Sequence, residues 1–281
     1  KGAANGLRSA SVPVVTHGSD LTLAPTITPV VHQAGGTVRI ALDRLAAAGC
    51  AAVQMDAALS GIRPRELNLR ARKDLMALMV RRGMRLSGID LFVPRRHFLD
   101  SVHQDRAVHA TLAAIGLAAD LGRVPLSISL PIAELKADVK DCLVEAADGH
   151  GVRLAVHAED ELDALLAWLK QVDLPTIGAA LDPALIMAQS LDPATIASKI
   201  ATRMAVARLN DQSSSSGSEN AAALTRCPVG TGELDLVAYK ISVDLATSRS
   251  GPVVLDLRGL PNPLRAASAA IKAWDDAAIV L

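Results

Sequence analysis

Aromatic residues are scarce in this sequence, and neither sign of charge is in excess. Phe, Trp and Tyr make up 2% of the 281 residues, so few rings are available on which nucleic-acid bases could stack. Lys and Arg together number 29, as do Asp and Glu. No broad basic field is therefore present to attract phosphate backbones or an anionic membrane surface. We expect neither a nucleic acid nor a membrane as partner.

Cysteine is also rare, and long apolar runs are missing. Cys50, Cys142 and Cys227 are far apart with no C-x-x-C spacing, which is typical of neither a disulfide framework nor a zinc knuckle. The sequence contains no run of eighteen apolar residues, the length needed to span a membrane. Residues 1–15 lack the apolar centre of a signal peptide. These features predict a reduced, cytoplasmic protein. They leave the formation of a homo-oligomer open.

What the sequence does contain is an alternation of short apolar segments, rich in Val, Ile and Leu, with longer segments of helical periodicity. This alternation is typical of strand-helix units around a parallel sheet. Glycine stands at the end of several helical segments, directly before a strand, where a left-handed conformation is needed; examples are Gly49, Gly83, Gly122 and Gly151. The eight predicted strands are residues 20–27, 51–57, 85–92, 124–131, 152–159, 176–183, 204–211 and 251–259.

Eight such units predict an α/β fold, a (β/α)8 TIM barrel, rather than an open doubly wound sheet. A dinucleotide-binding sheet would carry G-x-G-x-x-G directly after a strand, and no predicted strand is followed by it. We expect residues 20–281 to form one barrel domain and residues 1–19 to form an N-terminal extension. The longest predicted loop, residues 211–235, contains the segment SSSSGSEN. Such a segment is typical of a solvated tip, but a loop at this end of a barrel can also cover a substrate.

Polar and charged residues occur near the carboxyl ends of the predicted strands. In a barrel these ends meet at one mouth, so side chains distant in sequence can converge there. Barrel interiors usually consist of Val, Ile and Leu, and charged residues at these positions therefore indicate a site. The candidates are Gln54, Asp56, Asp90, His157, Glu159, Asp182, Arg208, Asp211, Asp256 and Arg258.

These candidates also have structural interpretations. His157 could be a hydrogen-bonded histidine at the barrel rim, and Asp182 could cap the turn at Pro183. Arg208 and Asp256 could serve only as counter-ions. In the loop after the third strand, PRRHF (94–98) adds three basic residues that could bind an anionic group or remain solvated. No G-x-S-x-G motif occurs, which disfavours a serine hydrolase.

Five segments together resemble the sugar-phosphate isomerase/epimerase superfamily, the xylose isomerase-like TIM barrels. The resemblance lies in the order and spacing of segments from the second strand to the end of the chain. The segments are GCAAVQMD (49–56), GVRLAVHAED (151–160), TIGAALDPALIMAQSLDP (176–193), VARLNDQ (206–212) followed by PVGTGELD (228–235), and GPVVLDLRG (251–259).

The resemblance implies a small polyhydroxylated, sugar-like substrate and proton transfer next to a carbonyl group. Members of the family bind one divalent metal with a Glu, an Asp, a His and a Glu, and the matching positions here are His157, Asp182, Arg208 and Asp256. We take His157, Asp182 and Asp256 as candidate catalytic residues and as candidate ligands of Mn, Zn or Mg. The candidate substrate-binding residues are Gln54, Asp90, His97, Arg208 and Asp211.

Arg208 argues against a metal at this site. A guanidinium is a permanent cation without a free lone pair, and its repulsion of a dication about 4 Å away would cost several kcal/mol even at an effective dielectric constant of roughly 20. We expect instead an ion pair of Arg208 with Asp182 or Asp256, in a pocket without a metal cofactor. Two alternatives follow: an isomerase-like or epimerase-like enzyme, or a barrel that has lost catalysis and binds a ligand or a partner.

A third alternative, the multi-zinc nuclease branch of the same superfamily, fits the sequence poorly. Such a cluster needs many histidine and acidic ligands. The chain has seven histidines, and only His157 lies at the end of a predicted strand.

Overall fold

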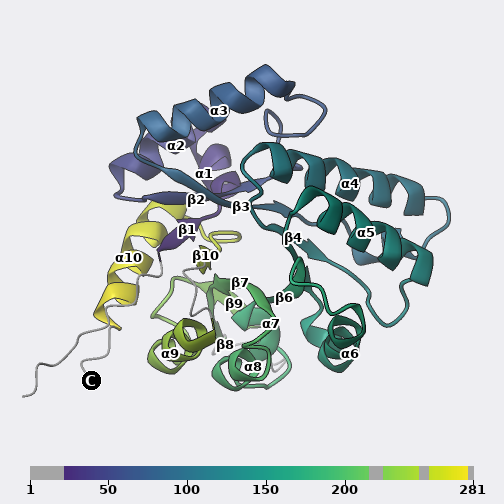
Figure 1. Ribbon diagram of the computed structural model, residues 1–281. Coiled ribbons are helices and arrows are strands. Elements are labelled where there is room, and N and C mark those ends of the chain that lie inside the picture. Colours follow the sequence, from purple (N-terminus) through teal and green to yellow (C-terminus); the bar gives the residue numbers. More distant parts are fainter. Residues whose placement is uncertain (1–21, 215–223, 247–252, 278–281) are drawn as a thin grey trace, which may run out of the picture.

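The structure is a computed structural model that describes residues 22–214, 224–246 and 253–277 (Figure 1). Eight parallel strands form one sheet in the order β1-β10-β7-β6-β5-β4-β3-β2. A single parallel bridge between Thr26 and Gln54 brings the two edges of the sheet together, so the barrel is nearly closed. The prediction of a TIM barrel is confirmed. The strands are β1 Leu23–Pro25, β2 Ala52–Asp56, β3 Arg85–Leu91, β4 Leu126–Ser129, β5 Leu154–His157, β6 Ile177–Leu181, β7 Met204–Leu209 and β10 Val253–Leu255.

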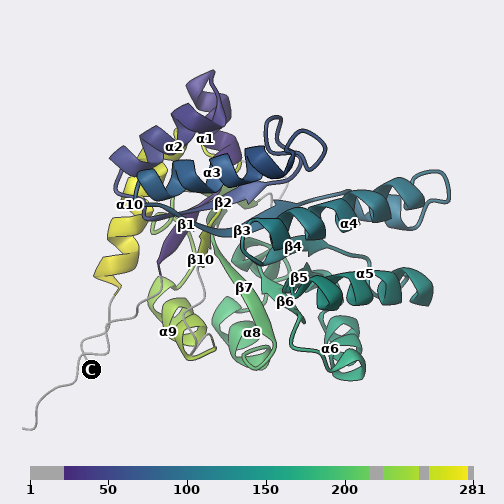
Figure 2. The ribbon, with the colours of Figure 1, turned by 45° about the horizontal axis from the view of Figure 1, so that its top comes forward.

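Helices surround the strands on the outside (Figures 1 and 2). Their amphipathic faces explain this position: in α6 the side chains of Leu165, Trp168 and Leu169 are buried against the sheet, at helical spacing. Gly151, which ends α5, adopts the expected left-handed conformation with φ 61°. The helices are α1 Ile27–Ala34, α2 Val38–Ala47, α3 Leu69–Arg81, α4 Gln104–Asp120, α5 Ala137–His150, α6 Leu162–Val172, α7 Pro183–Met187, α8 Pro193–Lys199, α9 Leu236–Ala246 and α10 Pro263–Asp276, with short 3-10 helices η1 Arg95–Phe98 and η2 Glu159–Glu161.

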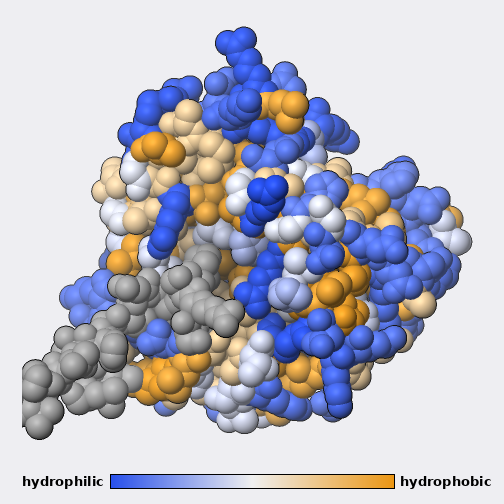
Figure 3. All heavy atoms as spheres, viewed as in Figure 1, coloured by the Kyte–Doolittle hydropathy of each residue, from blue (hydrophilic) through white to orange (hydrophobic). Residues whose placement is uncertain are grey.

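The face of the molecule shown in Figure 3 is largely polar. Hydrophilic side chains cover much of the outer helices there, with hydrophobic ones between them. Within the described residues, none of the helices combines the length and the hydrophobicity that crossing a membrane requires.

The barrel interior contains a layer of small apolar side chains. Ala155, Ala180, Val206 and Val254 belong to a buried cluster separate from the large core between the sheet and the helices. Alternate residues of a strand point to opposite faces. The residue two positions after each of these four therefore also points into the barrel, one layer closer to the mouth. Those residues are His157, Asp182, Arg208 and Asp256.

One expectation about the fold is wrong. The segment predicted as a loop, residues 211–235, begins with an antiparallel hairpin made of β8 (Asp211–Ser214) and β9 (Leu224–Cys227). Strands of only four residues, DQSS in β8 and LTRC in β9, are too short to show the alternation of apolar and polar residues that reveals a strand in sequence. Most of SSSSGSEN and the predicted N-terminal extension, residues 1–19, lie outside the described residues.

Candidate functional site

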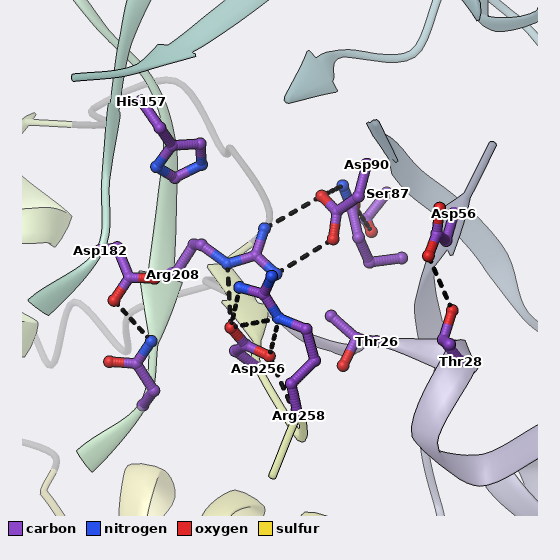
Figure 4. A network of polar contacts seen from close by, with 12 residues as sticks. Thr26, Thr28, Asp56, Ser87, Asp90, His157, Asp182, Arg208, Asp256 and Arg258 are labelled. Atoms are coloured by element: carbon purple, nitrogen blue, oxygen red, sulfur yellow. Dashed lines mark hydrogen bonds and ion pairs between the residues drawn. The ribbon is translucent and has the colours of Figure 1, made fainter. Parts of the chain in front are cut away.

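Arg208, at the end of β7, lies at the centre of the polar layer (Figure 4). Its side chain is fully buried, and its Nη1 and Nη2 donate to Asp90 Oδ1 and Oδ2 at 3.0 Å each. Its Nε lies 3.5 Å from Asp256 Oδ2. Burial alone would lower the pKa of Arg208, but the charges of Asp90, Asp256 and Asp182 raise it above its usual value. The expected ion pair with Asp256 is present, while Asp90 is a second and closer partner that the sequence did not reveal.

Asp90 is held in place by two neighbours. Gln54 Nε2 donates to Asp90 Oδ1 at 2.8 Å, and Ser87 Oγ donates to Gln54 Oε1 at 2.8 Å. A Cβ at Gly88 would lie only 2.8 Å from Gln54 Oε1, so a glycine is needed there for this amide to fit. Gln54 and Asp90 were both predicted to bind substrate, and the structure does bring them together. Their polar groups, however, are used to orient Asp90 toward Arg208.

Asp256, directly after β10, accepts contacts from three arginines. Arg258 Nε donates to its Oδ1 at 2.9 Å, Arg226 Nη1 lies 2.8 Å from its Oδ2, and Arg208 is the third. Burial alone would raise the pKa of Asp256, but Arg208, Arg258 and Arg226 together hold it well below its usual range. A carboxylate with so low a pKa is a weak base, which disfavours proton transfer by Asp256.

Asp182 combines a structural role with a position in the site. Its Oδ1 accepts from Ala184 N at 3.1 Å, which caps α7 where Pro183 begins the helix, and also from Asn210 Nδ2 at 2.7 Å. Its Oδ2 lies 3.5 Å from Arg226 Nη2. The capping interpretation is therefore correct, and Arg226 rather than Arg208 is the cation bonded to Asp182.

His157, at the end of β5, forms a pair with Glu159. Its Nδ1 lies 2.7 Å from Glu159 Oε1, an oxygen that also accepts from Asp182 N at 3.0 Å. The Nε2 atom of His157 is buried and has no hydrogen-bond partner among the described residues. A carboxylate at Nδ1 favours a proton on that nitrogen, which leaves the lone pair of Nε2 free. The ring of His157 lies against Phe92, with centroids 5.5 Å apart.

Asp211 organises the loop after the hairpin. Both of its carboxylate oxygens accept backbone N–H groups, at 2.9 to 3.0 Å, and a Cβ at Gly232 would lie 2.3 Å from its Oδ1. The predicted substrate-binding carboxylate is thus occupied by its own loop. The donors are the N–H groups of Gln212, Gly230, Gly232 and Leu234.

His97, predicted to bind substrate, lies in η1 rather than in the network around Arg208. Its ring stacks on that of His103 with centroids 4.7 Å apart, and His103 Nδ1 lies 2.5 Å from Asp100 Oδ2. The neighbouring Arg95 forms an ion pair with Asp160 at 2.6 Å, which joins η1 to η2. No recorded contact among the described residues joins His97 to the barrel interior.

Asp56, at the end of β2, lies beside the network without joining it (Figure 4). Its Oδ2 accepts from Thr28 Oγ1 at 3.1 Å and its Oδ1 from Ala58 N at 2.7 Å. Burial raises the pKa of Asp56, although the hydrogen bond from Ala58 opposes the shift.

The side chains at the metal-binding positions of the resembled family do not fit a divalent ion. The oxygens of Asp256 face three guanidiniums, and the permanent cation of Arg208 stands at the position of the family's histidine. Among the described residues, no group of three or more His, Cys, Asp or Glu is arranged to hold a metal.

Several residues of the site were missed or left without a role in the sequence analysis. Arg226 lies in the hairpin that was predicted as a loop, and Phe92 follows β3 as one of only two phenylalanines. Asn210 lies between the candidates Arg208 and Asp211 in the sequence. Arg258 follows Asp256 by two residues, and in a strand this spacing places both side chains on the same face. The spacing could therefore have predicted that Arg258 and Asp256 are partners.

Comparisons with known proteins agree with this architecture. The family model described as xylose isomerase-like TIM barrel matches residues 42–276. A xylose isomerase domain protein from Planctomyces limnophilus is 16% identical, with a TM-score of 0.68 over 92% of this chain and 96% of that one. D-allulose 3-epimerase from Methylomonas sp. is 13% identical, with a TM-score of 0.67 over 92% and 98%. A xylose isomerase-like TIM barrel protein from Mycobacterium smegmatis, in complex with magnesium, is 13% identical, with a TM-score of 0.63 over 92% and 96%.

A comparison with curated proteins found no match. The identities to the solved structures are low, so these structures support the fold and not a particular activity. The family model covers most of the chain, however, and it agrees with the eight parallel strands and the outer helices. The chain belongs to the xylose isomerase-like TIM barrel family.

Proposed function

We propose that this protein binds a small polyhydroxylated carbonyl compound at the mouth of the barrel and moves a proton next to the carbonyl group, without a divalent metal. The observation that carries the proposal is the His157–Glu159 pair, in which Nδ1 is held at 2.7 Å and Nε2 is buried without a partner among the described residues. The D-allulose 3-epimerase from Methylomonas sp., which has a similar fold, supports the choice of a sugar-like substrate.

His157 is the best candidate for the proton-transfer group. Imidazole can accept and donate a proton near neutral pH, and a carboxylate at one nitrogen orients the other toward a substrate. Asp90, Asp182 and Asp256 are less suitable because each is already bonded to an arginine or to Asn210. Removal of a proton next to a carbonyl places negative charge on the carbonyl oxygen, and guanidinium groups can stabilise that charge.

The second candidate function is ligand binding without catalysis. The bonds within the site favour it, because they already engage three of the four side chains at the matched positions. His157 is then the only one of the four that is free to move a proton. In this case the barrel would bind the same class of compound and leave it unchanged.

The test is hydrogen exchange in deuterated water. The protein is treated with a chelator and incubated with a panel of aldoses, ketoses, sugar acids and sugar phosphates, and NMR follows the hydrogen on the carbon next to the carbonyl. We expect exchange that survives chelation and is lost in His157→Asn. The control is His103→Asn, which changes a histidine outside the barrel interior.

The outcomes separate the alternatives. Exchange that requires added Mn²⁺ or Mg²⁺ would contradict a metal-free reaction. Binding of a panel compound without exchange would favour the non-catalytic barrel. Absence of both binding and exchange across the panel would contradict both candidate functions.

A further inference from the structure

We infer that the substrate carries an anionic group, a carboxylate or a phosphate, and that Arg226 and Arg258 bind it. The inference rests on the proposed function, because it names the substrate class for the same site. It also gives Arg226 and Arg258 a role in ligand binding, in addition to their contacts with Asp256.

The exposure of the charged groups shows which of them an entering ligand would meet. The side chains of Asp90, Asp182 and Asp256 are 6%, 3% and 0% exposed. Those of Arg226 and Arg258 are 26% and 41% exposed. The carboxylates therefore lie beneath the two guanidiniums. A ligand that approaches the network reaches positive charge first.

Both arginines have donors to spare. Arg258 uses Nε and Nη2 for Asp256, and Arg226 points Nη1 at Asp256 and Nη2 at Asp182. Within the described part of the chain, Arg258 Nη1 and Arg226 Nε make no recorded hydrogen bond or ion pair. The Nη1 of Arg226 is close to Asp256 but not aligned for a hydrogen bond. A guanidinium has five N–H donors, and its planar shape suits the oxygens of a carboxylate or a phosphate.

Asp256 alone is a limited counter-ion for these groups. Its single charge faces Arg208, Arg226 and Arg258 at once, and Asp182, the other carboxylate near Arg226, is 3.5 Å away and already accepts from Asn210. An anion bound to Arg226 and Arg258 would relieve this competition. Buried Arg208 needs no such partner because Asp90 binds it at two points.

Phe92 places this pair of arginines near the proton-transfer group. The Cζ atom of Arg258 lies 4.7 Å from the centroid of the Phe92 ring, and the ring of His157 lies 5.5 Å from the same centroid. Phe92 is itself only partly buried. Arg258 and His157 therefore lie against the same ring, and we place the anionic group of the ligand at Arg258 and its reacting carbon toward His157, whose side chain is 3% exposed.

Binding measurements test the inference. Isothermal titration of the full chain compares D-glucuronate, D-glucose 6-phosphate and D-glucose, which separates a carboxylate, a phosphate and a neutral sugar, at low and high salt. We expect at least one charged sugar to bind roughly ten to a hundred times more tightly than glucose, as charge-assisted hydrogen bonds provide. Arg258→Gln and Arg226→Gln should each remove most of this preference, whereas Arg258→Lys should keep part of it. The control, Arg82→Gln, changes an arginine paired with Asp43 after α3, at the opposite end of the barrel.

Each outcome decides a separate point. Equal binding of neutral and charged sugars, or a preference that survives Arg226→Gln and Arg258→Gln in folded protein, overturns the inference but leaves the proposed function standing. Binding of none of the three compounds overturns the inference and counts against the proposed function as well. Circular dichroism of each variant shows whether it has folded, and Arg258→Lys retains a cation beside Asp256 if Arg258→Gln does not fold.

Discussion

Arg208 and Asp90 bond to each other across the axis of the barrel. Arg208 is on β7 and Asp90 is on β3, and β6, β5 and β4 lie between them on one side of the sheet order. In an eight-stranded barrel these two strands are opposite one another. The two-point ion pair therefore fills the centre of the polar layer and joins the two halves of the barrel.

The first prediction concerns the stability that this pair provides. Arg208→Met leaves Asp90 buried without its cation, and breaking a buried ion pair usually costs about 3–5 kcal/mol in the free energy of unfolding. Urea denaturation measures the loss. The double variant Arg208→Met with Asp90→Asn should lose less than the sum of the two single variants, because both charges of the pair are then gone. Additive losses would show that the two residues do not stabilise each other.

The second prediction concerns pH. Burial raises the pKa of Asp56 in the folded protein above its ordinary value of 3.8. Such a group stabilises the fold only below its unfolded pKa, and its contribution is lost as the pH rises through the folded pKa. Asp56→Asn should therefore raise the melting temperature at neutral pH, and the gain should shrink as the pH falls through the raised folded pKa and be absent below the ordinary value of 3.8. Asn retains an oxygen for the N–H of Ala58.

The control for this pH experiment is Asp192→Asn. The pKa of Asp192 is lowered, mainly by its hydrogen bond from Thr195, so the shift is opposite in direction to that of Asp56. A lowered pKa stabilises the fold above the unfolded value, and this stability is lost as the pH falls toward the folded pKa. Asp192→Asn should therefore lower the melting temperature at neutral pH. The same direction of change in both variants would contradict the argument.

The third prediction concerns the loop built around Asp211. Gly232→Ala places a Cβ 2.3 Å from Asp211 Oδ1, so the loop must shift and some of its four N–H bonds must lengthen. We expect a loss of roughly 1–3 kcal/mol in unfolding free energy. The control is Gly116→Ala in α4, where the added Cβ meets no atom within 4 Å and the helix should gain roughly 0.5–1 kcal/mol. Equal stability of wild type and Gly232→Ala would mean that the loop is not held by this carboxylate.

The sequence predicts the barrel well because strand length, helical periodicity and terminal glycines are local properties. It also predicts that His157, Asp182, Arg208 and Asp256 converge, since strand ends of a closed barrel share one mouth. The partners of Arg208 are a different matter. The sequence predicts Asp182 or Asp256, whereas the structure pairs Arg208 with Asp90 and Asp256. Selecting the right carboxylates requires knowing which alternate residues face the axis. Arg226 was missed because its strand is only four residues long and lies in a segment predicted as a loop.

The last prediction follows from the mismatch between this site and a metal centre. In the resembled family the four positions hold Glu, Asp, His and Glu, whereas here they are His157, Asp182, Arg208 and Asp256. The double variant His157→Glu with Arg208→His replaces the cation with an imidazole and adds a carboxylate, so the set becomes two Asp, one Glu and one His. Such a set suits Mn²⁺ or Zn²⁺. We expect the double variant to bind Mn²⁺ measurably by electron paramagnetic resonance, and the wild type and His157→Glu alone to bind much more weakly. If the wild type binds Mn²⁺ as tightly as the double variant, Arg208 does not exclude a metal, and the metal-free reaction proposed here is wrong.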